Sequence, residues 1–301
     1  MEDSKKSPSK ISERLLLIGG IGVLIVVAIL VGFYGAGFLV NKQKQADIPK
    51  AGKSTTKAQI FHNMVLIPAG EFIMGTDKVK EKSLPASFGL KNPQYENEQP
   101  MHTVFLDAFY IAKFEVTNFE YKYFLETSQA KLPEYWINLD LKQWGRYPVM
   151  NVSWLEADSY CKWKGQRLPT EAEWEKAARG TDGRRFPWGN EFDKNKANNQ
   201  QKSLAPIGFF QEDVSPYGSN DMGGNVSEWV GSWYKPYPEN EYHDPDFGEK
   251  YRVVRGGSWG GVGHYYISYY ARTAFRAFAD PTKRYNDTGF RCAMSPNLNS
   301  N

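Results

Sequence analysis

The first long hydrophobic stretch of the chain covers residues 15–40, which contain no charged side chain. A helix of that length would extend about 39 Å at about 1.5 Å per residue, whereas the hydrocarbon core of a bilayer is about 30 Å thick. Apolar residues occur on every side of such a helix, as in a membrane span. The stretch also exceeds the roughly 7–15 apolar residues of a cleaved signal peptide. We therefore expect an uncleaved transmembrane signal anchor at residues 15–40.

The segments that flank this stretch are polar. Residues 1–14 are interpreted as a cytoplasmic tail, and residues 41–58, rich in Lys, Ala, Gly, Ser and Thr, as a flexible tether. The numbers of Lys and Arg residues before and after residues 15–40 are nearly equal, so the positive-inside rule does not determine the orientation of the helix in the membrane. We expect the folded domain, residues 59–297, to be periplasmic or extracellular, because large domains that follow a membrane span are translocated across the membrane largely regardless of their charge.

Alternating apolar residues predict strands early in this domain. Residues 64–74 predict a strand, a turn at Pro68-Ala69-Gly70 and a second strand. Residues 76–100 are charged and broken by Pro and Gly, and are expected to form a long loop. Residues 102–113 alternate again, which predicts one further strand.

Helical spacing and helix-start signals predict three helices. Residues 117–127 place aromatic side chains at helical spacing. Ser153 with Glu156, and Thr170 with Glu173, have the spacing of a capping box, so a helix is expected to begin after each Ser or Thr. We expect these helices to end near Gly165 and near Arg179-Gly180, where glycine can close a helix.

Composition refines this outline. Aromatic residues make up 15% of the chain, which has 27 Gly and nine Trp. After residue 180 no long periodic segment appears, so we expect a loop-rich α+β domain of short strands. The net charge of +3 argues against a nucleic-acid partner.

Two cysteines are present, Cys161 and Cys292. A single pair is too few for a tetrahedral thiolate metal site. The residues alone allow either two free buried thiols or one disulfide, and the compartment decides between them.

The stretch Asp221–Trp229 carries candidate metal chemistry. Asp221 and Glu228 flank Gly223 and Gly224, and these glycines allow backbone conformations that side chains forbid. Carboxylates and bare carbonyls are the oxygen ligands that calcium prefers. A tight turn with two solvated acids accounts for the same residues, because the spacing is not that of a standard calcium loop.

Seven motifs together give the chain a resemblance to a known family. They are residues 65–75, 109–118, 167–175, 186–189, 221–229, 255–259 and 289–292. In this order the chain resembles the formylglycine-generating enzyme (sulfatase-modifying factor) family across residues 60–295. The resemblance implies a formylglycine-generating-enzyme type variant of the C-type lectin fold. It is less specific for activity, since function belongs to sites and not to folds.

The resemblance also implies structural features. It pairs Cys161 with Cys292 in a disulfide, which suits an oxidising compartment. It places structural calcium on the side chains of Asp221 and Glu228. The remaining calcium ligands that it implies are the backbone carbonyls of Gly224 and Val226.

Catalysis is where the chain departs from the family. The enzymes of the family resemble one another in two active-site cysteines that bind copper, and those positions are occupied here by Gly263 and Ser268. Copper is therefore not expected, because copper(I) requires soft thiolates. A related branch uses non-haem iron held by histidines of a separate helical domain, which this chain lacks. His264 is the one histidine in the corresponding segment. An iron cofactor is therefore kept as an alternative that no other residue supports.

The same segment is rich in tyrosine and arginine, which are typical of binding surfaces. An alternative interpretation is that alternate side chains of a strand face the core. The groove candidates are Ser258, His264, Tyr265, Tyr266, Tyr269, Tyr270, Arg272 and Arg276.

The sequence thus supports two functions. The first is a membrane-anchored extracytoplasmic binding or accessory module for an unknown peptide, protein or small molecule, without copper-dependent cysteine oxidation. The second is a metal-dependent oxidoreductase that uses iron or copper on an unknown substrate.

Overall fold

The computed structural model describes residues 63–77, 95–128, 130, 139–198, 203–260 and 270–296. The expected tail, anchor and tether lie outside these residues. No helix in the described ranges is long and apolar enough to cross a membrane. The described elements all belong to one compact unit, Thr55–Asn301.

The N-terminal strands form two antiparallel pairs. The expected strand–turn–strand is confirmed as β1 (Met64–Ile67) and β2 (Gly70–Met74). The single strand expected at residues 102–113 is wrong, because the chain forms β3 (His102–Leu106) and β4 (Phe109–Ala112) instead. β3 pairs with β2, whereas β4 pairs with β1 and with β9 (Ala293–Met294). The break at residues 107–108 therefore moves the chain from one sheet to the other.

Three helices were expected, and all three are present: α3 (Asn118–Ser128), α5 (Trp154–Trp163) and α6 (Glu171–Arg179). Both capping boxes form as expected. At α5, for example, the Ser153 backbone N–H donates to Glu156 Oε2 at 2.8 Å. Two short helices were not expected: the 3₁₀ helix η2 (Glu96–Glu98), within the predicted loop, and α4 (Leu141–Trp144).

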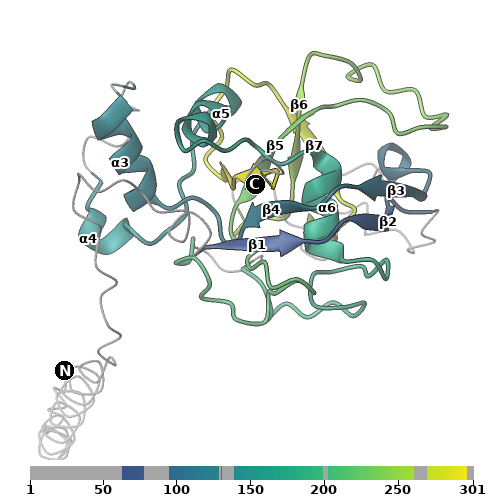
Figure 1. The fold of residues 1–301 in the computed structure, drawn as a ribbon, viewed down its shortest axis with the longest axis horizontal. Coiled ribbons are helices and arrows are strands. Elements are labelled where there is room, and N and C mark those ends of the chain that lie inside the picture. The colour runs from purple at the N-terminus through teal and green to yellow at the C-terminus, as the bar shows by residue number, and fades with distance from the viewer. Residues whose placement is uncertain are drawn as a thin grey trace, which may run out of the picture. The chain divides into compact units, whose positions relative to one another are not determined.

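A four-stranded sheet occupies the C-terminal half of the described domain (Figure 1). Its strand order is β7 (Arg276–Ala279), β6 (Arg252–Arg255), β5 (Ser227–Trp233) and β8 (Thr288–Phe290). β5 and β6 are antiparallel, whereas β5 and β8 are parallel.

Alternate side chains of this sheet enter two hydrophobic cores. Trp229 and Val254 pack with residues of α3 and α5 in the first core. Val230 and Val253 pack with Trp174 of α6 and with β1 and β4 in the second. The period of two along each strand thus sends neighbouring residues to opposite faces, and helices cover both.

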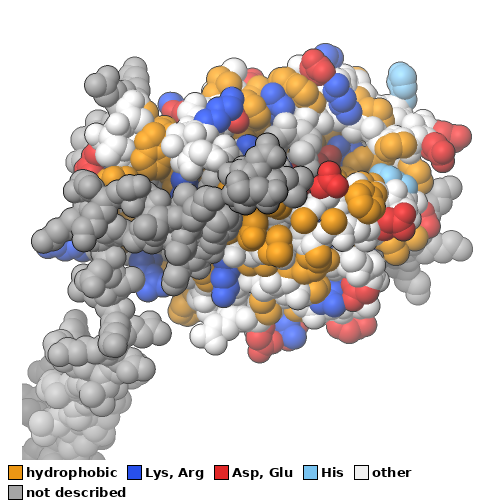
Figure 2. All heavy atoms as spheres, viewed as in Figure 1, with side chains coloured by type: hydrophobic (Ala, Val, Ile, Leu, Met, Phe, Trp, Pro, Cys, Tyr) orange, Lys and Arg blue, Asp and Glu red, His pale blue; other side chains and the backbone are white. Residues whose placement is uncertain are grey.

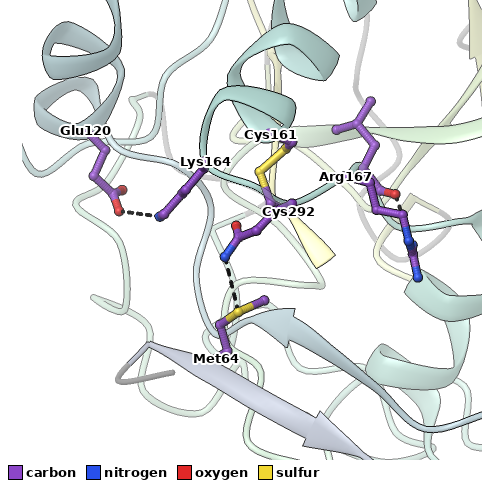
Figure 3. Close-up of a disulfide and its surroundings, with 8 residues drawn as sticks. Met64, Glu120, Cys161, Lys164, Arg167 and Cys292 are labelled. Atoms are coloured by element: carbon purple, nitrogen blue, oxygen red, sulfur yellow. Dashed lines mark hydrogen bonds and ion pairs between the residues drawn. A yellow bond between two sulfur atoms is a disulfide. The ribbon is translucent and has the colours of Figure 1, made fainter. Parts of the chain in front are cut away.

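The disulfide between Cys161 and Cys292 is confirmed. Cys161 lies on α5, and Cys292 lies between β8 and β9, so the bond joins the first core to the end of the domain (Figure 3). Both residues are fully buried, with exposed fractions of 0% and 1%. The bond connects positions 131 residues apart.

Charged side chains of both signs are interspersed on the face of the molecule shown in Figure 2. Non-specific binding to nucleic acid depends on a concentration of Lys and Arg. The described side chains of this face therefore form no continuous basic surface for nucleic acid.

Candidate functional site

The loop from Asp221 to Val226 lies directly before β5. Its left-handed residues are Asp221, with φ of 58°, and Asn225, with φ of 72°, and Asp and Asn tolerate this conformation better than most residues. Gly223 and Gly224 were expected to allow backbone conformations that side chains forbid, but the structure requires them for a different reason. A Cβ atom on Gly224 would lie 2.7 Å from the Asn198 carbonyl oxygen, and one on Gly223 2.6 Å from the Trp188 ring. They are needed for close packing.

Asn225 joins the loop to its surroundings. Its backbone N–H donates to the Asn198 carbonyl at 2.8 Å, and its side-chain oxygen accepts from Asn198 Nδ2 at 2.9 Å. Its side-chain nitrogen donates to Glu115 Oε1 at 3.2 Å. Its carbonyl accepts from the backbone N–H of Trp259 at 2.8 Å. One side chain and its backbone thus connect the loop to three separate segments.

Glu228 is committed to an ion pair. Both of its oxygens accept from Arg291, each at 2.7 Å, and Trp174 Nε1 also donates to Oε2 at 2.8 Å. Glu228 and Arg291 are both buried. A buried carboxylate paired in this way has its charge compensated, so Glu228 is less available to a metal than an unpaired acid.

Three further carboxylates are buried around this pair: Glu115, Asp213 and Asp221, with exposed fractions of 1%, 1% and 2%. Asp221 accepts from the backbone N–H of Gly208 at 2.6 Å, and Asp213 from that of Gly223 at 3.0 Å. Glu115 Oε2 has no hydrogen-bond partner among the described residues. Four acids therefore surround the single guanidinium of Arg291.

The electrostatics follow from this crowding. Burial raises the pKa of Glu115 and of Asp213 well above the usual range, and the Asp221 carboxylate raises both further. Burial also raises the pKa of Asp221, to about 6, against the opposing effects of the Gly208 N–H and Arg291. Unpaired buried charge is costly, so this cluster favours protons or a cation.

The predicted calcium ligands fit this environment in part. Asp221 lies within the excess negative charge, and Glu115 Oε2 has no hydrogen-bond partner among the described residues. Within the described ranges, however, no three or more His, Cys, Asp or Glu side chains are grouped as a metal site. Glu228 would have to share its carboxylate between Arg291 and a metal. No sequence motif identified Asp213 as part of this site, or Glu115, which lies 110 residues from Asn225.

The groove candidates are placed unevenly. His264, Tyr265, Tyr266 and Tyr269 lie outside the described residues, as do Gly263 and Ser268. Ser258 is buried, and Tyr270 is half-buried with its ring 4.9 Å from Phe275.

The two groove arginines are buried and paired. Arg272 donates to both oxygens of Glu98 at 2.7 Å, and Arg276 donates to Glu171 at 2.9 Å. Each is 2% exposed. They therefore hold the framework together and do not present their guanidinium groups to solvent.

A buried ionic network extends this arrangement. Arg255 of β6 donates to Thr273 O at 2.7 Å and pairs with Glu171 and Glu175 of α6. Glu175 also pairs with Arg179 at 2.7 Å. No sequence pattern predicts this network, because charged residues on a helix ordinarily face water.

Comparison with known proteins agrees with this architecture. The sulfatase-modifying factor enzyme 1-like domain matches residues 50–296. The formylglycine-generating enzyme of Streptomyces coelicolor is 31% identical, covering 84% of this chain and 94% of that protein. The inactive Cα-formylglycine-generating enzyme 2 of Bos taurus is also 31% identical, covering 77% and 87%.

The structure of PvdO from Pseudomonas aeruginosa has a similar fold, with a TM-score of 0.60 and 26% identity, covering 77% of this chain and 94% of that one. The chain is also 32% identical to the serine/threonine-protein kinase pkn1 of Chlamydia caviae. That match covers 80% of this chain but only 39% of the length of the kinase.

Proposed function

Because this chain belongs to the sulfatase-modifying factor enzyme 1-like family, we propose that it is a binding or accessory module without copper-dependent cysteine oxidation. The disulfide carries this proposal, because Cys161 and Cys292 are the only cysteines of the chain and are bonded to each other. No thiolate is left for copper(I), which requires soft ligands. The Bos taurus relative, which the match covers to 87% of its length, is likewise named an inactive formylglycine-generating enzyme.

The test is an assay for the family reaction. Copper-loaded protein is incubated with a sulfatase-motif peptide and oxygen, and the peptide is analysed by mass spectrometry. We expect no aldehyde above a metal-only blank. Loss of the peptide thiol with formation of an aldehyde would overturn the proposal.

The proposed ligand groove uses the tyrosine-rich segment. Tyr265, Tyr266, Tyr269 and Tyr270, with His264, would contact a peptide, protein or small molecule. Arg272 and Arg276 would act as positioning residues, since both are buried in ion pairs. Replacing the four tyrosines with alanine should weaken ligand binding, while the calcium-dependent rise in melting temperature should remain.

The alternative is a metal-dependent oxidoreductase. The similarity to the Streptomyces coelicolor enzyme over 94% of its length supports it. Metal analysis of the purified domain separates the two functions. Calcium alone favours the binding module, and stoichiometric iron or copper favours the oxidoreductase.

A structural calcium ion at the Asp221 loop is part of this proposal, as is the relation of the fold to C-type lectins. Four buried carboxylates against one guanidinium support a cation there. Asp221 and the carbonyls of Gly224 and Val226 would hold it, whereas Glu228 would stay paired with Arg291. Calcium would neutralise buried charge.

We place the domain outside the cytoplasm, anchored by residues 15–40. The uncharged length of that stretch supports this location, and the disulfide suits an oxidising compartment. Protease added to intact cells, with the outer envelope permeabilised where one is present, should digest the domain. Full protection would contradict the orientation.

A further inference from the structure

A second candidate binding surface lies on the loop that follows α6. The segment 188–196, without Gly189, lines an open hollow of about 690 Å³. Ligand pockets in proteins are typically about 300–1,000 Å³. One short loop therefore supplies both the walls and the chemistry of a space large enough for a small ligand.

The loop is fixed by its own hydrogen bonds. Phe186 and Gly189 exchange backbone bonds of 2.8 and 3.0 Å, and Arg185 N donates to Asn190 Oδ1 at 3.0 Å. Trp188 Nε1 donates to the Glu191 carbonyl at 2.9 Å. A loop ordered before binding loses little entropy when a ligand arrives.

Aromatic rings give the hollow an apolar surface. The Trp188 ring stacks on the buried Phe186 ring with an interplanar angle of 6° and centroids 5.3 Å apart. Phe192 packs on the same ring at 5.5 Å and is still 37% exposed. Trp188 is also in close contact with Gly223. The Trp188 and Phe192 rings are thus held in place by packing on Phe186, while part of their surface faces solvent.

The polar lining carries no net charge. Glu191 and Asp193 are balanced by Lys194 and Lys196, and Lys196 pairs with Glu212 at 3.2 Å. Asn190 and Asn195 add amide groups that donate and accept hydrogen bonds. This balance disfavours polyanions such as nucleic acid, which require a basic surface.

We propose that this hollow binds a neutral saccharide. The C–H faces of a sugar ring would lie on Trp188 and Phe192, and its hydroxyl groups would bond to the surrounding amide and carboxylate groups. An extended peptide typically pairs with a free sheet edge, whereas the hollow is lined by loop residues. The proposal does not depend on the function proposed above, because the hollow shares no residue with the tyrosine-rich segment.

The test measures binding of three tetrasaccharides, cellotetraose, chitotetraose and maltotetraose, by calorimetry and tryptophan fluorescence with the full chain in detergent. We expect saturable binding of at least one. Phe192→Ser should weaken it about tenfold or more, which corresponds to about 1.4 kcal/mol. Asn195→Ala, which removes a solvent-exposed amide, should weaken it too.

The matched control is Phe209→Ser, since Phe209 is 67% exposed and lies outside the hollow. It should leave saccharide binding unchanged, and melting curves verify that each variant is folded. The proposal is overturned if none of the three saccharides binds, or if the folded Phe192→Ser and Asn195→Ala variants bind like the unmodified protein.

Discussion

At the scale of single residues, Arg291 is the side chain that compensates the buried negative charge around the Asp221 loop. It binds both oxygens of Glu228 and also donates to the Asn220 carbonyl at 2.9 Å. Removing one partner of a buried ion pair costs about 3–5 kcal/mol, because the other charge stays buried. We expect Arg291→Met to lower the free energy of unfolding by about that amount, measured by denaturant titration.

Arg284→Met provides the control for this prediction. Arg284 pairs with Glu156 at 2.6 Å, but the two side chains are 47% and 24% exposed. Exposed pairs contribute about 0–1 kcal/mol, so this variant should lose far less stability. Equal losses in the two variants would contradict the importance given to burial.

The calcium proposal also belongs to the residue scale. Adding calcium to chelated protein should raise its melting temperature by linkage. Asp221→Ala should abolish most of this rise, because it removes the proposed side-chain ligand. Glu228→Gln should lower the melting temperature with and without calcium, since it weakens the pair with Arg291, but should retain the rise.

Two results would count against that assignment. Absence of any calcium effect on the unmodified protein would remove the site. Loss of the calcium effect in Glu228→Gln alone would show that Glu228 leaves Arg291 to coordinate the ion.

At the scale of elements, α5 depends on its first turn. Burial would raise the pKa of Glu156, but bonds from Arg284 and from the Ser153 N–H and hydroxyl together hold its pKa below the ordinary value. The folded state therefore favours the ionised carboxyl. This stabilisation is present above the unfolded-state pKa of about 4.3 and is lost as pH falls through the lower folded-state value.

We expect Glu156→Gln to reduce the dependence of unfolding free energy on pH in this acidic range. Unfolding at a series of pH values measures it. Ser153→Ala should cost about 1 kcal/mol near neutral pH, as is typical for the loss of an N-cap. An unchanged pH profile in Glu156→Gln would show that the pair does not couple to folding.

At the scale of the whole molecule, the disulfide limits the freedom of the unfolded chain. It connects positions 131 residues apart. A closed loop of that size corresponds to about 5 kcal/mol in the chain-entropy treatment, with engineered bonds often giving less. The double variant Cys161→Ala and Cys292→Ala should therefore unfold at a clearly lower denaturant concentration, and reductant should have no further effect on it.

The elements that the sequence predicted correctly depend on neighbouring residues. Capping boxes form between positions three apart, and the turn between β1 and β2 contains its own proline and glycine, although the two strands pair with different partners. The break between β3 and β4 was missed for the opposite reason. Alternation continues across residues 102–113, and only pairing with two different partners reveals the break.

By itself the sequence determined the helix starts, the first strand–turn–strand and, through its ordered motifs, the family and the disulfide. Only the tertiary structure decided which charges meet. Glu228 lies 63 residues from Arg291, and Glu115 lies 110 residues from Asn225. A carboxylate that looks available in sequence is free or committed according to the side chains that folding brings to it. The spacing of neighbouring residues in the sequence does not predict these long-range contacts.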